Sequence, residues 1–170
     1  MKLLFVIDMQ EVTVGENHAK MFHYEENLMA RVNARIEEYP PEHVIYIRNL
    51  MKKNLINKLA PVQVYDGTHE AELADGLRVV SEHIFKKYQG DAFTNNELER
   101  FVAEQAPKEI EMVGVDGGGC VGLTAIGAAS RGYQVSVNQN CVGTIMTKQE
   151  KKLRRKMERM GIKYLSFRKL

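Results

Sequence analysis

The sequence is poor in cysteine and proline and contains no tryptophan: its 170 residues include four prolines and two cysteines, Cys120 and Cys141. Two cysteines in a chain of this length do not form a disulfide framework, so we expect both thiols to be reduced. No apolar run approaches the roughly 18 residues of a membrane-spanning helix. The opening apolar run, residues 3–7, ends at Asp8, well short of the roughly 7 to 15 residues of a signal-peptide core. These absences predict a cytoplasmic protein with no membrane partner.

An excess of charge of one sign is also missing. The chain has 24 Lys and Arg against 22 Asp and Glu, for a formal net charge of +2. The strongest basic run is KKLRRK at residues 151–156, but helical spacing turns Leu153, Met157 and Met160 inward and leaves the charges in solvent. We therefore predict no nucleic-acid partner. A hydrophobic fraction of 44% and a charged fraction of 27% are typical of a folded globular protein.

Short apolar runs alternate with longer amphipathic segments, and no linker or repeat interrupts them, so we predict a single domain over residues 1–170. This alternation indicates right-handed crossovers and a mainly parallel sheet that helices cover on both faces, a three-layer α/β/α fold. The predicted strands are residues 3–7, 44–47, 83–85, 110–115, 133–137 and 162–167, and the predicted helices are residues 22–39, 71–77, 95–105, 121–130 and 148–160, with a helical turn at 54–59.

Reactive groups of such a sheet collect beyond the carboxyl ends of the strands. Asp8 follows the first predicted strand, Lys86 and Lys87 follow the third, and Cys120 follows the fourth after three glycines. A thiol attacks as the thiolate, which requires a base to take the proton or a cation to stabilise the charge. Asp8 is the candidate base and Lys87 the candidate cation. Cys120 also opens a helix, whose free N–H groups stabilise a sulfur anion or a developing oxyanion.

Each of these residues also has a structural interpretation. Asp8 is either an acid that acts on the thiol or a strand-end carboxylate with a structural partner. Lys86 and Lys87 alternate in direction along the strand, so only one of them faces the site, and the spacing to Phe93 favours Lys87. Cys120 by itself resembles a small buried apolar residue. Cys141 is interpreted as packing, with a position at the pocket rim as the alternative.

Five segments occur in the order typical of one family: LLFVIDMQ (3–10), VIYIRN (44–49), GTHEAEL (67–73), FKKYQGDAFTNNEL (85–98) and GVDGGGCVGLTAIGAASRGYQV (114–135). Together they resemble the isochorismatase-like cysteine hydrolases, which include nicotinamidases, N-carbamoylsarcosine amidohydrolases and ureidoacrylate amidohydrolases. The resemblance implies a six-stranded, mainly parallel, Rossmann-like sheet. It also implies a catalytic triad, which by position is Asp8, Lys87 and Cys120.

The resemblance further implies an amidohydrolase mechanism in which the cysteine forms a thioester acyl-enzyme with an amide, ureide or related small-molecule substrate. By position, the oxyanion hole consists of the backbone N–H groups of Asp116 and Cys120, with a cis peptide bond before Asp116. Phe93 is a candidate for the substrate-binding wall, although burial in the core is the commoner role of such a residue. Gln10 is a second candidate for substrate binding and otherwise satisfies backbone groups near the site. The resemblance also implies a homo-oligomer.

The chain departs from the family pattern in several places, two of which bear on the predicted site. Residues 48–59, RNLMKKNLINKL, contain no His or Asp, so we predict no nicotinamidase-type metal site and no cofactor. The family's usual Thr-containing tetrapeptide before the cysteine is replaced by Asp116 and three glycines, which predicts a roomier loop. The sequence therefore predicts a metal-independent cysteine hydrolase.

Two other functions compete with this prediction. GGGCVG at residues 117–122 matches the glycine pattern of a Rossmann-type dinucleotide-binding module. Such a module expects an acidic residue about 20 positions on, where this chain reads NQN. The second alternative is a catalytically silent protein that binds a small molecule, against which the complete set of Asp8, Lys87 and Cys120 argues.

Overall fold

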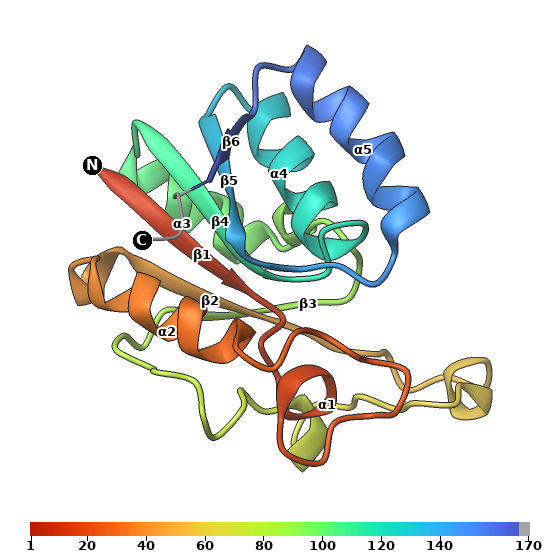
Figure 1. The fold of residues 1–170 in the computed structure, drawn as a ribbon. Helices are drawn as coiled ribbons and strands as arrows, with labels where there is room; N and C mark the ends of the chain where they lie inside the picture. Colours follow the sequence, from red (N-terminus) through yellow and green to blue (C-terminus); the bar gives the residue numbers. More distant parts are fainter. Residues whose placement is uncertain (167–170) are drawn as a thin grey trace.

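The computed structural model describes residues 1–166 and contains a six-stranded sheet in the order β3-β2-β1-β4-β5-β6 (Figure 1). Every neighbouring pair of strands is parallel, which confirms the predicted fold class. The strands are β1 (Lys2–Ile7), β2 (Val44–Asn49), β3 (Ile84–Lys87), β4 (Glu109–Val115), β5 (Gln134–Gly143) and β6 (Lys163–Leu165).

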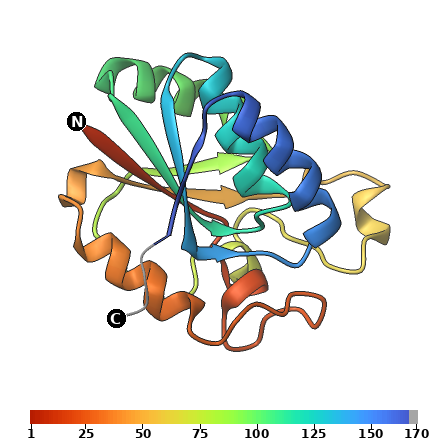
Figure 2. The same cartoon turned by 45° about the horizontal axis from the view of Figure 1, so that its top comes forward.

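Helices cover both faces of this sheet (Figure 2). One face packs against α2 (Leu28–Glu37), and the other packs against α3 (Asn96–Gln105), α4 (Cys120–Ser130) and α5 (Thr147–Arg159). A single-turn helix, α1 (Glu11–Val14), follows β1. Asn95 caps α3, because its side chain accepts hydrogen bonds from the N–H groups of Glu97 and Leu98. No helix within residues 1–166 is long and apolar enough to span a bilayer.

The continuous apolar run of β1 is explained by burial on both faces. Leu3, Phe5 and Ile7 point into the core beneath α3, α4 and α5, whereas Leu4 and Val6 point into the core beneath α2. All five side chains are 0% exposed. Since successive strand residues point to opposite faces, a central parallel strand needs apolar residues at every position. Such a strand holds the residue that follows it, Asp8, in a fixed place.

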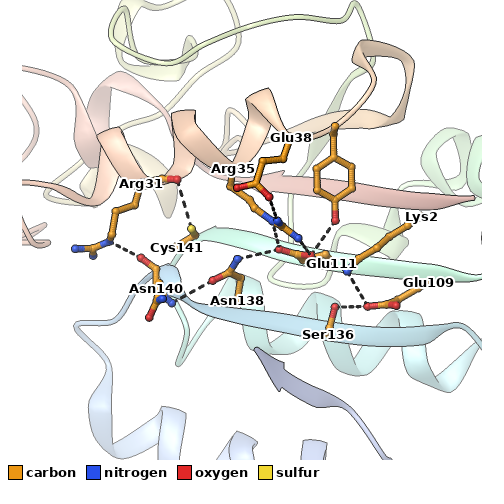
Figure 3. Close-up of polar contacts among 11 residues, drawn as sticks. Lys2, Arg31, Arg35, Glu38, Glu109, Glu111, Ser136, Asn138, Asn140 and Cys141 are labelled. Atoms are coloured by element: carbon orange, nitrogen blue, oxygen red, sulfur yellow. Dashed lines mark hydrogen bonds and ion pairs between the residues drawn. The ribbon is translucent and has the colours of Figure 1, made fainter. Parts of the chain in front are cut away.

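Part of the layer between α2 and the sheet is polar rather than apolar (Figure 3). Glu111 of β4 is 0% exposed, and its carboxylate accepts two hydrogen bonds from Arg35 of α2, each of 2.7 Å. Lys2, Tyr39 and Asn138 donate to the same carboxylate at 2.8, 2.8 and 2.9 Å. We refer to these five residues as the Glu111 cluster. It ties α2 to β1, β4 and β5.

Two predicted helices are wrong. Residues 22–27 precede α2 rather than belong to it, because the side chains of Phe22 and Tyr24 pack against the body of the protein. The helix predicted at residues 71–77 is absent: a short 3-10 turn, His69–Ala71, is followed by a bridge residue, Leu73, and a turn at residues 74–77. Residues 72–74 pair with the segment after β1, through Glu11 N–H to Glu72 O and Ala74 N–H to Met9 O.

β5 differs most from its predicted bounds, and β2 and β3 each end two residues later than predicted. β5 continues past Val137 to Gly143, because β4 and β5 resume pairing beyond an irregularity at Met112 and Gly114. β6 is described as Lys163–Leu165, and the end of the strand predicted at 162–167 lies outside the described residues. The extension of β5 brings its carboxyl end beside the loop that follows β4.

Candidate active site

The carboxyl ends of four adjacent strands meet at one edge of the sheet. Asp8 follows β1, Asn49 ends β2, Lys87 ends β3, and Cys120 begins α4 shortly after β4. Strands β1 and β4 are neighbours from which the chain proceeds in opposite directions across the sheet, and such a switch point forms a crevice for ligands. The topology therefore places these side chains together although they are far apart in sequence.

Lys87 lies at the centre of this group. Its ammonium nitrogen is 2.9 Å from Asp8 Oδ2, 3.0 Å from Cys120 Sγ and 3.0 Å from Asn49 Oδ1. The side chains of Lys87 and Asp8 are 0% and 6% exposed. The predicted convergence of acid, amine and thiol is thus confirmed. Three partners account for all three donors of the ammonium group, so Lys87 holds the other three side chains in one arrangement.

The two neighbouring lysines of β3 point to opposite faces, as strand geometry requires. Lys86 is exposed and pairs with Asp66 at 2.7 Å. Lys87 is the lysine that faces the site, as its spacing to Phe93 predicted.

Asp8 is held in an unusual conformation. Its φ of 54° is in the left-handed region, which costs a non-glycine residue roughly 1–3 kcal/mol. Thr13 donates its hydroxyl to the Asp8 carbonyl at 2.6 Å. The second carboxylate oxygen, Oδ1, is buried and has no hydrogen-bond partner among the described residues. Burial raises the pKa of Asp8 above its usual value, against the opposing charge of Lys87.

The surroundings of Cys120 favour the thiol over the thiolate. Burial and the charge of Asp8 raise its pKa to about 12, although Lys87 acts in the opposite direction. Burial alone lowers the pKa of Lys87, but Asp8 and Cys120 outweigh it and the net shift is upward. A thiol with a raised pKa needs a base to take its proton before the sulfur can attack, and Asp8 is the carboxylate that shares Lys87 with it.

The glycines before Cys120 form a tight loop rather than the roomier one predicted. A Cβ atom on Gly117 would lie 2.3 Å from Thr144 Oγ1, and one on Gly118 would lie 2.2 Å from the Met146 carbonyl oxygen. Glycine is needed here because the loop packs directly on the segment that joins β5 to α5. The same packing argues against a dinucleotide-binding loop, whose glycines make room for a ligand.

Asp116, the first residue of this loop, is bound on several sides. Its peptide bond with Val115 is cis, at the predicted position. Its carboxylate accepts hydrogen bonds from the N–H groups of Gly118 at 2.7 Å and Ile145 at 2.6 Å, and from the Tyr24 hydroxyl at 3.2 Å. By contrast, the backbone N–H groups of Asp116 and Cys120 donate to no acceptor within residues 1–166. Both remain available to a ligand.

The structure corrects both predicted substrate-binding residues. Phe93 is 1% exposed, and its ring packs in the core between Phe5 and Tyr133, with centroid distances of 5.8 and 6.1 Å. The Gln10 side chain donates to the carbonyl oxygens of Asn49 and Ala71 and accepts from the Asn49 N–H. Both amide hydrogens of Gln10 are thus engaged with backbone, as the alternative interpretation held.

The second cysteine lies away from the site. Cys141 is 5% exposed, and its sulfur lies 3.5 Å from the carbonyl oxygen of Arg31 in the core beneath α2. This confirms the interpretation of Cys141 as a packing residue. Burial raises its pKa to about 11.

A family model, the isochorismatase domain, matches residues 2–167 of the chain. The protein belongs to the isochorismatase family. This finding confirms the resemblance seen in the sequence and covers nearly the whole chain. The sequence has no significant match among curated proteins.

Solved structures with amidase names share this isochorismatase fold. The pyrazinamidase of Pyrococcus horikoshii, in complex with zinc, is 21% identical, has a TM-score of 0.81, and aligns over 98% of this chain and 99% of its own. The pyrazinamidase/nicotinamidase of Streptococcus mutans is 18% identical, with a TM-score of 0.81 over 97% and 100%. The N-carbamoylsarcosine amidase of Thermoplasma acidophilum is 17% identical, with a TM-score of 0.79 over 99% and 98%. At these identities the likeness establishes the fold alone.

A zinc site does not fit the donors of this isochorismatase-family chain. Within residues 1–166 no three His, Cys, Asp or Glu side chains are grouped so that they could hold a metal ion. The segment after β2, residues 48–59, has neither His nor Asp. Zinc sites in proteins use three or four such ligands. We therefore derive no catalytic step through a metal.

Two residues of the site escaped prediction. Asn49 could have been found, because it ends β2 and the ends of the other strands supplied candidates. Tyr24 could not, because it lies in a segment predicted to be helical and no short-range pattern links it to Asp116.

Proposed function

We propose that the protein is a cysteine hydrolase that cleaves an amide, ureide or related C–N bond of a small molecule through a thioester acyl-enzyme. Membership of the isochorismatase family supports a hydrolase. The observation that carries the finer proposal is the position of Lys87, whose ammonium nitrogen lies 2.9 Å from Asp8 and 3.0 Å from Cys120. The buried amine of Lys87 thus contacts both the acid Asp8 and the thiol of Cys120.

In the first half of the reaction the Asp8 carboxylate accepts the thiol proton of Cys120 as the sulfur attacks the carbonyl carbon. The raised pKa of Asp8 suits it to this role, because a stronger base takes up a proton more readily. Lys87 stabilises the negative charge that moves onto the sulfur. The C–S bond forms, the C–N bond breaks, and Asp8 returns its proton to the leaving nitrogen.

The negative charge on the carbonyl oxygen is bound by the N–H groups of Asp116 and Cys120. Neither group has an acceptor among the described residues, and the N-terminus of α4 adds a favourable dipole. In the second half of the reaction water attacks the thioester and gives a proton to Asp8. The C–S bond then breaks, the acid product leaves, and the proton returns to the thiolate.

The experiment is a panel of small amides and ureides, assayed by release of ammonia or amine, with wild-type protein, Cys120→Ala and Cys141→Ala. We expect Cys120→Ala to lose activity, because no other described thiol lies near Lys87. Cys141→Ala is the matched control and should keep the wild-type rate. Mass spectrometry of acid-quenched reactions should detect an acyl adduct on Cys120.

Equal rates for wild type and Cys120→Ala would exclude the thiol as nucleophile. A wild-type protein that binds compounds of the panel but turns over none of them would instead favour the catalytically silent binding protein.

A further inference from the structure

Tyr24 lies in the segment between α1 and α2 and is fixed against the sheet. A Cβ atom on Gly143 of β5 would lie 2.5 Å from Cδ1 of Tyr24, so the ring occupies the space that this glycine leaves open. The ring is stacked on Phe22 with a centroid distance of 6.4 Å and an interplanar angle of 11°. The phenol therefore has one defined position.

The start of α2 holds this segment from the other side. Arg31 of α2 pairs with Glu25 at 2.7 Å. The same side chain donates to the carbonyl oxygen of Asn140 in β5 (Figure 3). Arg35, one turn further along α2, binds Glu111 of β4. Glu25, the residue next to Tyr24, is thus tied through Arg31 to β5, whose carboxyl end lies beside the loop before Cys120.

The hydroxyl of Tyr24 meets the carboxylate of Asp116. It donates to Oδ2 at 3.2 Å, and the N–H of Ile145 donates to the same oxygen at 2.6 Å. The N–H of Gly118 donates to Oδ1 at 2.7 Å. The carboxylate therefore joins three segments: the chain before α2, the loop before Cys120, and the connection from β5 to α5.

Tyr24 is also part of the electrostatic environment of the triad. Burial raises its pKa above the usual range, and the charges of Asp116, Asp8 and Cys120 raise it further. The raised pKa keeps the phenol protonated, so its hydroxyl can donate to the Asp116 carboxylate.

We propose that Tyr24 is a positioning residue: its hydroxyl holds the carboxylate of Asp116 and so aims the backbone N–H of the same residue at the oxyanion. The proposal rests on the function proposed above. A donor stabilises an oxyanion only when it is already aimed at the place where the charge develops, so the loss of such a support lowers the rate more than the affinity.

The first test is Tyr24→Phe, which keeps the ring and removes the hydroxyl. Its matched control is Tyr39→Phe, which removes a second buried phenol that donates to a carboxylate, here Glu111 at 2.8 Å and away from Cys120. We expect Tyr24→Phe to lower kcat about tenfold, a modest loss for an indirect effect on an oxyanion donor, with KM within twofold. Tyr39→Phe should leave kcat unchanged. An unchanged kcat in Tyr24→Phe would overturn the proposal.

A double-mutant cycle shows whether Tyr24 acts through Asp116. If it does, Tyr24→Phe has no further effect on kcat in an Asp116→Ala background. Equal effects in both backgrounds would mean that the hydroxyl acts on something else and would also overturn the proposal.

Amide hydrogen exchange supplies a readout that needs no activity. The N–H groups of Gly118 and Ile145 donate to the Asp116 carboxylate, and we expect both to exchange at least about tenfold faster in Tyr24→Phe. The control Tyr39→Phe should leave them unchanged, and unchanged exchange in Tyr24→Phe would count against the positioning role. If wild type hydrolyses nothing, the proposed function fails, yet the exchange result still decides whether Tyr24 holds the loop.

Discussion

Two buried carboxylates on neighbouring strands of the sheet have opposite surroundings. Asp8, after β1, is 4% exposed and accepts a side-chain hydrogen bond from Lys87 on one oxygen, while its other oxygen has no hydrogen-bond partner among the described residues. Glu111, on β4, is 0% exposed and accepts five hydrogen bonds or ion pairs from the Glu111 cluster. The two residues have the same functional group and similar burial but different numbers of donors.

The number of hydrogen-bond donors around each carboxylate, rather than its burial, explains the opposite pKa shifts of Asp8 and Glu111. Burial acts to raise both, but the donors around Glu111, Arg35 first among them, outweigh it and lower its pKa to about 2. At Asp8 burial prevails and the pKa is raised. A saturated carboxylate is a fixed charge that holds elements together, whereas an under-satisfied one is ready to accept a proton. This contrast separates the structural acid from the acid of the proposed reaction.

The largest expected effect is that of Asp8→Asn on activity. The amide cannot take the thiol proton, so we expect kcat to fall by roughly 10³-fold or more. The free energy of unfolding should fall as well, because the substitution leaves the buried ammonium of Lys87 without its charged partner, so kcat is compared per folded protein. The measurements are kcat and the urea midpoint of the same preparations. A variant that retained a tenth of the wild-type rate would remove Asp8 from the role of base.

Glu111→Gln should lower stability without lowering activity. It leaves Arg35 and Lys2 without their buried partner, which typically costs roughly 3–5 kcal/mol in the free energy of unfolding. We expect kcat of the folded fraction to stay within about twofold, because the Glu111 cluster does not contact Lys87 or Cys120. Glu109→Gln is the control, since that side chain is 28% exposed and pairs with the same Lys2. A loss of activity without loss of stability would contradict the structural role.

The same contrast appears in the pH dependence of stability. The folded pKa of Glu111, about 2, is below the unfolded value of about 4.5, so its contribution is present above pH 4.5 and is lost as the pH falls towards 2. The shift corresponds to at most about 3 kcal/mol. Asp8 has the opposite sign, because its raised pKa favours the folded state at low pH. Urea unfolding between pH 5 and 2 should therefore show a steep loss of stability in wild type and a shallower one in Glu111→Gln.

The sequence identified Asp8, the acid of the site, as a candidate, but it gave no indication of the structural role of Glu111. Asp8, Lys87 and Cys120 each come directly after a strand or open the following helix, so the rule for parallel sheets brings them to one edge without any knowledge of the packing. Glu111 stands inside an apolar strand. Its partners come from β1, β5 and the region of α2, and no short-range spacing relates them.

The errors of the prediction have the same origin. Residues 22–27, predicted to begin a helix, instead precede α2 without helical structure, and Tyr24 among them binds Asp116, which is distant in sequence. The segment 71–77 pairs with the chain after β1 instead of forming a helix. Phe93 is predicted to line the pocket because it stands in the motif at residues 85–98. Its ring instead packs in the core against Phe5 and Tyr133, which are distant in sequence. In each case contacts distant in sequence outweigh a local preference.

The smallest expected effect is on the reactivity of the Cys120 thiol. It tests most directly how Asp8 differs from the structural acid Glu111. Since the charge of Asp8 raises the pKa of Cys120, Asp8→Asn should lower that pKa and leave Lys87 to stabilise the thiolate. We expect iodoacetamide to alkylate Cys120 several-fold faster near pH 8 in Asp8→Asn than in wild type, in the same variant that has lost turnover. Cys141, followed by peptide mass spectrometry in the same samples, should react at an unchanged rate. Slower alkylation of Cys120 in the variant would show that Asp8 promotes formation of the thiolate before substrate binds. Asp8 could then no longer be described as a base that acts only during the reaction.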